Sequence, residues 1–128
     1  MPDNSNKYRF EVRAEPAYLE EQSDPSENRY VFAYTITIRN TGTVAARLIS
    51  RHWFIVDANG NEREVRGDGV VGEQPHLRPG ENFRYTSGAM LETPVGSMRG
   101  SYQMLADDGV RFDVPIPVFT LAIPRTLH

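Results

Sequence analysis

The chain has 128 residues, no cysteine, 14 basic and 17 acidic residues, and a formal net charge of -3. This length suits one domain with one core. The slight acidic excess argues against a nucleic-acid partner, and the lack of cysteine excludes disulfides, thiolate nucleophiles and cysteine-bound zinc. We therefore expect one domain over residues 1–128, with residues 1–7 flexible.

We expect no signal peptide and no membrane-spanning segment. The N-terminal residues are polar and lack the apolar segment of a signal peptide. No apolar run approaches the roughly 20 residues that a membrane-spanning helix needs. We expect a cytoplasmic protein that is a monomer or a weak homodimer, with no membrane as partner.

The N-terminal third predicts two strands. The first covers residues 8–12 and 17–19 and is interrupted by Pro16, and a polar, acidic loop follows at residues 20–28. Residues 30–39 alternate between two faces, with large apolar side chains on one face (Tyr30, Phe32, Tyr34, Ile36 and Ile38) and smaller or polar ones on the other (Val31, Ala33, Thr35, Thr37 and Arg39). This period of two is typical of a strand that buries one face.

The middle of the chain predicts a hairpin and a further strand. Residues 47–57 form a strand that ends at Asn59-Gly60, which favours a type I′ turn with positive φ at both central residues, and a return strand follows at 61–65. Pro79-Gly80 then indicates a type II turn that leads into a strand at 82–87.

The C-terminal third predicts a second hairpin, with strands at 98–105 and 110–123 around Asp107-Asp108-Gly109. The apolar parity of the last strand changes between Val114 and Phe119. A bulge or bend at residues 115–117 would shift the register by one and explain the change. The two prolines there lack an N–H donor, which places the segment at a sheet edge or a sheet crossing.

About seven short strands with regular turns and no helical stretch predict an all-β fold. The expected architecture is an antiparallel β-sandwich of the fibronectin type III-like or immunoglobulin-like kind. A closed barrel is the alternative. The sandwich is favoured because the long loop at 63–81 breaks the even strand spacing of a barrel.

One motif in that loop, Gly67-Asp68-Gly69-Val70-Val71-Gly72, matches the spelling of a dinucleotide-binding fingerprint. A working fingerprint opens a helix, whose N-terminus holds the pyrophosphate. Here two prolines, Pro75 and Pro79, follow within a few residues. No helix is therefore expected after the glycines.

Two interpretations of the glycines remain. In the favoured one they supply positive φ in a loop where backbone segments approach closely. In the other, Gly67, Gly69 and Gly72 form an anion-binding nest, assisted by Arg66 and, nearby, Arg63. Asp68 and Glu73 belong to the same loop and would repel a phosphate.

Signals for catalysis or metal binding are weak. The three histidines, His52, His76 and His128, follow no metal-ligand spacing, and there is no G-x-S-x-G motif. We expect no catalytic residue, cofactor or metal. The acidic residues Glu62, Glu64, Asp68 and Glu73 indicate a solvated face. The aromatic residues expected in the core are Tyr8, Tyr18, Tyr30, Tyr34, Trp53, Phe54, Phe83, Tyr85, Tyr102, Phe112 and Phe119.

An ordered set of short motifs along nearly the whole chain resembles the ApaG family. The set comprises Ser50-Arg51-His52-Trp53, the stretch 64–75 around the glycines, Leu77-Arg78-Pro79-Gly80-Glu81, Tyr85-Thr86-Ser87-Gly88, Met98-Arg99-Gly100-Ser101-Tyr102 and Ile116-Pro117-Val118-Phe119. The resemblance implies a bacterial fibronectin type III-like domain, sometimes called CorD. It also implies a gene neighbourhood shared with a diadenosine tetraphosphate hydrolase and a link to magnesium and cobalt tolerance.

The same resemblance implies a protein-interaction role, since similar domains occur in F-box and polymerase-interacting proteins. The family's proposed pyrophosphate loop maps onto Gly67, Gly69 and Gly72. Two hypotheses follow. The first is a non-enzymatic module that binds a protein partner through a sandwich face or an edge strand. The second is a protein that binds a nucleotide, pyrophosphate or divalent cation at residues 63–76.

Overall fold

The structure, a computed structural model, describes residues 6–124. Residues 1–5 lie outside the described part, and so does most of the segment expected to be flexible. Eight strands and two short 3-10 helices form the fold: β1 (Phe10–Tyr18), η2 (Glu20–Gln22), η3 (Pro25–Glu27), β2 (Tyr30–Asn40), β3 (Ala46–Asp57), β4 (Glu62–Asp68), β5 (His76–Leu77), β6 (Asn82–Leu91), β7 (Val95–Ala106) and β8 (Arg111–Ala122). No described helix is long and apolar enough to cross a membrane.

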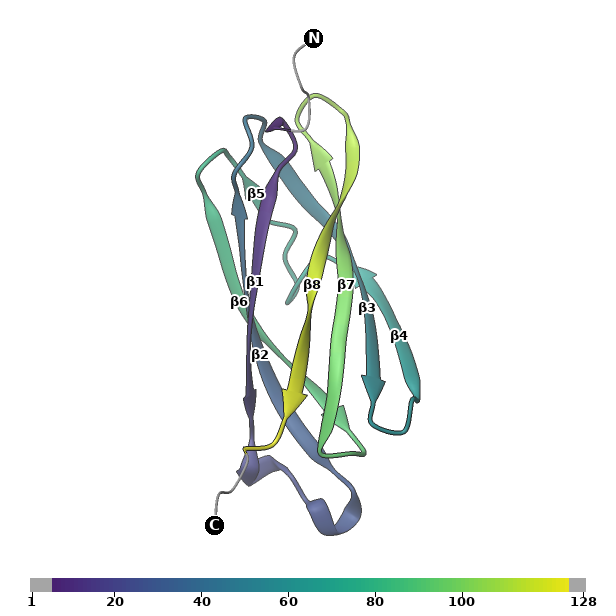
Figure 1. The fold of residues 1–128 in the computed structure, drawn as a ribbon. Coiled ribbons are helices and arrows are strands. Elements are labelled where there is room, and N and C mark those ends of the chain that lie inside the picture. The colour runs from purple at the N-terminus through teal and green to yellow at the C-terminus, as the bar shows by residue number, and fades with distance from the viewer. Residues whose placement is uncertain (1–5, 125–128) are drawn as a thin grey trace.

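The strands form two antiparallel sheets, which confirms the predicted sandwich (Figure 1). One sheet has the order β1-β2-β6, and the other has the order β4-β3-β7-β8, with β5 paired to β3. Along one side of the sandwich β1 and β8 lie next to each other. There the Phe112 ring packs on Tyr8 and Phe10 at centroid distances of 5.3 and 6.0 Å.

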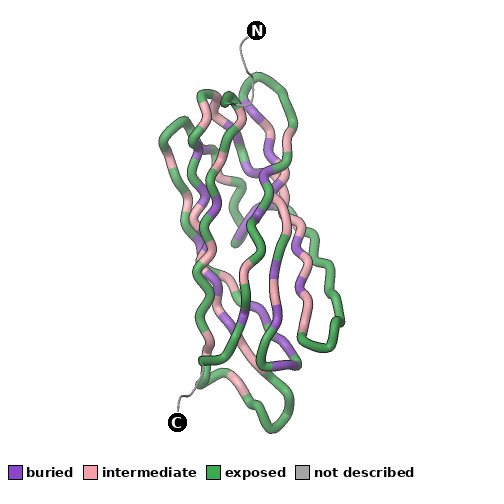
Figure 2. The backbone as a smooth tube through the Cα atoms, viewed as in Figure 1, coloured by how far each residue is buried: buried purple, intermediate pink, exposed green. Residues whose placement is uncertain are grey.

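The core lies between the two sheets, and burial alternates along the strands that form it (Figure 2). Four of the predicted core aromatics, Tyr34, Trp53, Tyr85 and Tyr102, are buried, and Phe32 is buried completely. Phe54 is an exception. It lies on the outer face of the larger sheet, against His52 at a ring distance of 4.5 Å and under the Arg99 guanidinium at 4.7 Å.

Two β-bulges shift the apolar parity of the long strands. In β8, Ile116 pairs with Gly100 and Phe119 with Met98, so one extra residue lies at Pro117-Val118, which confirms a bulge at the end of the predicted stretch 115–117. In β3, Leu48 pairs with Met104 and Ser50 with Gln103. The extra residue there is Ile49, and it turns Trp53 and Ile55 into the core.

Two local predictions were wrong. Pro16 does not interrupt the first strand, since β1 pairs with β2 continuously from Phe10 to Tyr18, and an edge strand accepts a proline whose missing N–H would face outward. Asn59-Gly60 does not form a type I′ turn. Gly60 has φ +82°, while Asn59 has no positive φ. The Gly60 amide donates to the Asp57 carbonyl at 3.1 Å, as in a three-residue loop with a glycine bulge.

Candidate functional site

The glycine motif forms a strand followed by a tight hairpin. Gly67 and Asp68 end β4, and the chain then folds back so that Val70 and Glu73 exchange two backbone hydrogen bonds of 2.8 and 2.9 Å. Val71 and Gly72, at the tip, have φ of +45° and +82°. Positive φ at both tip residues defines a type I′ turn. A helix N-terminus, which the dinucleotide fingerprint requires, is absent at this point of the described chain.

Gly69 is required by the backbone packing of this hairpin. Its φ is +60°, and a Cβ at this position would collide with the carbonyl oxygen of Glu73. The Gly69 amide donates to Ile49 at 2.8 Å, and the amides of Val70 and Glu73 donate to each other's carbonyls. These three N–H groups therefore already have partners. The geometry agrees with glycines that shape the loop.

The two arginines predicted to assist an anion are engaged elsewhere. Arg63 donates to the Met90 carbonyl at 2.9 Å. Arg66 forms an ion pair with Glu64 at 3.0 Å, on the outer face of the larger sheet. Neither arginine lines the cavity that the hairpin borders.

The cation beside the hairpin is Arg51, which was not among the predicted site residues. Its Nη1 donates to the carbonyls of Asp68 and Gly69, both at 2.9 Å. Gly67 gives it room, because a Cβ there would lie 2.7 Å from the Arg51 Nη2 atom. Among residues 6–124 no carboxylate forms an ion pair with Arg51. A half-buried positive charge thus has only neutral partners.

Arg51 borders a cavity of about 260 Å³ between the two sheets. Three hydroxyl-bearing side chains, Tyr34, Tyr85 and Ser87, come from the smaller sheet, and residues 70–72 of the hairpin close one end. Burial raises the pKa of Tyr34 and of Tyr85 above the ordinary tyrosine value. These hydroxyls therefore stay neutral and leave the charge of Arg51 uncompensated.

Behind the cavity, the Tyr85 hydroxyl contacts the hydroxyl of Tyr102 at 2.5 Å. Both side chains are buried, and burial raises the pKa of Tyr102 strongly. This hydrogen bond links the smaller sheet to the larger one, because Tyr85 belongs to β6 and Tyr102 to β7. It satisfies two polar atoms that would otherwise be costly inside the core.

A second hollow of about 580 Å³ lies on the larger sheet and is lined by Ser50, His52, Ser101 and Gln103, together with Arg51, Arg66, Gly67, Asp68 and Asp113. Gln103 accepts from the Ser50 hydroxyl at 2.8 Å and donates to Ser101 at 2.9 Å. His52 contacts Glu64 at 2.9 Å. Neither serine is bonded to the histidine, so the arrangement lacks the nucleophile and base pair of a hydrolase.

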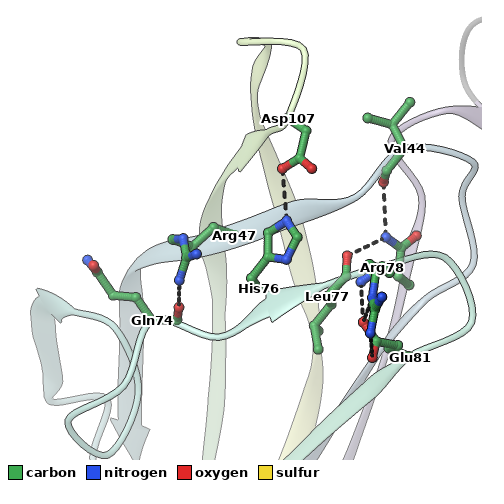
Figure 3. A network of polar contacts seen from close by, with 9 residues as sticks. Val44, Arg47, Gln74, His76, Leu77, Arg78, Glu81 and Asp107 are labelled. Atoms are coloured by element: carbon green, nitrogen blue, oxygen red, sulfur yellow. Dashed lines mark hydrogen bonds and ion pairs between the residues drawn. The ribbon is translucent and has the colours of Figure 1, made fainter.

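A polar network anchors the segment between the hairpin and β6 (Figure 3). His76 contacts Asp107 at 2.9 Å, and Arg47 donates to the Gln74 carbonyl at 2.7 Å. The buried Asn40 side chain donates to the carbonyls of Leu77 and Val44. These contacts tie the segment between the hairpin and β6 to β2, β3 and the turn after β7.

The histidines form no metal site with the other described residues, among which no group of three potential ligand side chains converges. His52 and His76 each contact a single carboxylate. His128 lies outside the described residues.

The cavity opens along β6, a ten-residue edge strand. Asn40 of β2 donates to Glu81 and accepts from Gly80, so its N–H and C=O face β6. Because these groups alternate in direction along a strand, those of Tyr85 and Ser87 face β2, and those of Thr86 and Gly88 face outward. The contact between Arg63 and the outward Met90 carbonyl agrees with this assignment.

The other long edge strands, β1, β4 and β8, carry features that discourage strand addition. Charged residues make up most of β4, Pro16 lies in β1 beside several charged side chains, and β8 contains two prolines and a bulge. Prolines, charges and bulges are the usual means by which proteins protect edges. β6 has one charged residue, Arg84, no proline and a continuous register with β2.

Comparisons with known proteins agree with this architecture. A sequence model of the ApaG domain matches residues 20–106. The protein ApaG of Azoarcus sp. (strain BH72) is 67% identical over 124 residues, which cover 97% of this chain and 98% of that protein. Its counterpart in Thiobacillus denitrificans is 67% identical over 95% of this chain and 96% of its own length.

A solved structure shares the fold. It is described as that of an ApaA protein from Bordetella pertussis, with a TM-score of 0.92 and 55% identity over 94% of this chain and 98% of the other. The family match extends from η2 to the end of β7 and includes the hairpin, Arg51 and β6. The chain belongs to the ApaG domain family.

Proposed function

We propose that the protein is a non-enzymatic binding module that takes an extended segment of a protein partner onto the free edge of β6. The observation that supports this most directly is the row of outward-facing backbone groups at Thr86 and Gly88, for which no described residue supplies a partner. An exposed edge of this kind pairs readily with another extended chain. The added strand would gain main-chain hydrogen bonds along β6.

Apolar side chains near this edge favour the same function. Val71, at the hairpin tip, is 56% exposed and lines the cavity together with Ser87. Met90, near the other end of β6, is 41% exposed and lines a second cavity of about 180 Å³ with Arg63 of β4. Exposed apolar groups that border backbone donors and acceptors are typical of peptide-binding edges.

The second candidate function is binding of a small anion, such as a nucleotide or pyrophosphate, at residues 63–76. The free charge of Arg51 favours it. Against it stand the occupied amides of the hairpin and the carboxylates of Asp68 and Glu73, which would repel a multiply charged phosphate. We therefore rank it below peptide binding.

A proline substitution at an outward-facing position tests the proposal. Thr86→Pro removes an N–H that β2 does not use, while Thr86→Val removes the hydroxyl that contacts Thr35 at 2.8 Å and keeps the N–H. Partners captured from a lysate of the source cells by the wild-type chain would be compared with those captured by each variant. We expect the specific partner to be retained by Thr86→Val and lost with Thr86→Pro.

Two controls make the result interpretable. The urea midpoint of each variant shows that the domain remains folded. Nuclear magnetic resonance then shows whether the partner shifts the amides of Thr86 and Gly88. A partner that binds Thr86→Pro as tightly as the wild type, or that leaves these amides unshifted, would contradict binding at the β6 edge.

A further inference from the structure

We infer that the segment bound at β6 carries an acidic side chain that enters the cavity and pairs with Arg51. The inference rests on the proposed function, since it assigns the chemistry of the partner at that same edge. The class of ligand is an extended peptide with a glutamate or aspartate near the centre of the added strand.

The direction of side chains in a sheet supports this assignment. Residues paired across two strands point to the same face. Tyr85 and Ser87 point inward, because both line the cavity between the sheets. A residue of the added strand that pairs with either of them would therefore point toward the larger sheet, where Arg51 lies. Residues paired with Thr86 and Gly88 would point to the outer face.

The electrostatics of the cavity favour a carboxylate. Arg51 forms hydrogen bonds through Nη1 to two carbonyls and has no carboxylate partner among the described residues. The cavity adds the hydroxyls of Tyr34, Tyr85 and Ser87, which can donate to an anion. A half-buried guanidinium gains more from a carboxylate than an exposed one, because water screens the pair less.

A singly charged group also fits better than a phosphate. The cavity offers one cation, while Asp68 contributes to its lining. A phosphate dianion or pyrophosphate would meet this one positive charge, and Asp68 would repel it more strongly than it repels a singly charged carboxylate. A peptide carboxylate balances Arg51 with a single charge, and the main-chain ladder along β6 holds the peptide in place.

Two display libraries of short peptides test the inference on the full-length chain. Both are randomised except for the central residue, which is glutamate in one library and glutamine in the other. We expect the glutamate library to yield binders that Thr86→Pro abolishes. Each binder should weaken by about tenfold or more when its glutamate is replaced by glutamine, the usual effect of losing a charge-assisted hydrogen bond.

The Arg51→Gln variant completes a double-mutant cycle between Arg51 and the central glutamate of the peptide. If Arg51 forms an ion pair with the peptide carboxylate, the glutamate and glutamine forms of one peptide should bind the Arg51→Gln variant with equal affinity. Equal binding of both forms to the wild type would overturn the inference, while sensitivity to Thr86→Pro would leave the proposed function intact. If neither library yields a binder that Thr86→Pro abolishes, the proposed function fails and the inference fails with it.

A separate titration tests the alternative ligand, a small phosphate-containing anion. Inorganic pyrophosphate is titrated while the side-chain resonance of Arg51 and the peptide affinities are followed. Saturable binding of pyrophosphate at Arg51, together with equal affinities of the glutamate and glutamine peptides, would assign the cavity to a small anion and overturn the inference. Competition confined to the glutamate peptide agrees with a carboxylate at Arg51.

Discussion

The guanidinium of Arg51 occupies the space that a side chain at Gly67 would fill. The two residues pair across β3 and β4, and a Cβ on Gly67 would lie within 3 Å of three guanidinium atoms. The first glycine of the motif thus makes room for a cation, whereas in a dinucleotide fingerprint the first glycine serves a tight turn before a helix. The glycine motif of this chain therefore matches the fingerprint in sequence, but its first glycine has a different structural role.

Gly69→Ala should destabilise the domain by about 2 kcal/mol or more. The substitution forces alanine into a left-handed conformation and drives its Cβ into the Glu73 carbonyl. Gly67→Ala is the matched control, because the atoms it meets end a flexible side chain that can move. Urea unfolding of both variants measures the difference. Similar midpoints for the two would show that the hairpin tolerates a Cβ at Gly69.

Val71→Asn should stabilise the domain by about 1 kcal/mol. Val71 is a β-branched residue at φ +45°, a conformation that costs valine more than asparagine. Its side chain is mostly exposed, so little apolar burial is lost. Val71→Thr keeps the branched Cβ and should leave the midpoint of thermal unfolding unchanged. A midpoint for Val71→Asn no higher than that of Val71→Thr would show that Val71 is not strained at the tip.

The stability of the domain should fall as the pH rises above the ordinary tyrosine pKa of 10.0. Burial raises the pKa of Tyr85 and Tyr102 in the folded state, so the unfolded chain releases these protons first. Their contribution is complete below pH 10 and is lost progressively above it. Urea midpoints across this range, with phenolate absorbance, check the prediction. Full ionisation of both tyrosines at pH 10 in the folded protein would refute it.

Much of the fold was predictable because a period-two pattern of apolar side chains indicates a strand, and turn-forming residues indicate where strands end. The alternating residues of β2 and the parity change in β8 led to the sandwich and to one of its bulges. The bulge at Ile49 was missed because both faces of the predicted strand at 47–57 carry apolar residues. The sequence pattern therefore does not show that Leu48 and Trp53, which differ in parity, both point into the core. The turn at Asn59-Gly60 was wrong because the Asp57 side chain accepts from the amides of Asn59 and Asn61, which favours the longer loop.

The candidate site was harder to predict. Arg51 has the same parity as the buried Trp53 and Ile55, and this was the available signal for an inward-facing cation. Its meeting with Tyr34 and Ser87 depends on contacts between the two sheets, which sequence periodicity does not encode. Arg63 and Arg66 also have different partners, the Met90 carbonyl and the Glu64 carboxylate, because they lie on opposite faces of β4.

The purified protein should not hydrolyse diadenosine tetraphosphate or nucleoside triphosphates in the presence of magnesium or cobalt. The lysine and hydroxyl residue that end a phosphate-binding loop are missing after Gly72, where Glu73 follows. Phosphate release assays check this. Turnover that disappears in Gly69→Ala or Arg66→Ala and persists in a distant surface variant such as Glu27→Gln would contradict a non-enzymatic role.

The most direct measurement is amide hydrogen exchange along β6, residue by residue. In the free protein, the amides of Tyr85 and Ser87, which face β2, should exchange slowly. Those of Thr86 and Gly88 should exchange much faster, because no described residue accepts their hydrogen bonds. Addition of a binding peptide should slow Thr86 and Gly88 selectively. Slow exchange at these two amides in the free protein, or unchanged exchange when the peptide binds, would contradict the account.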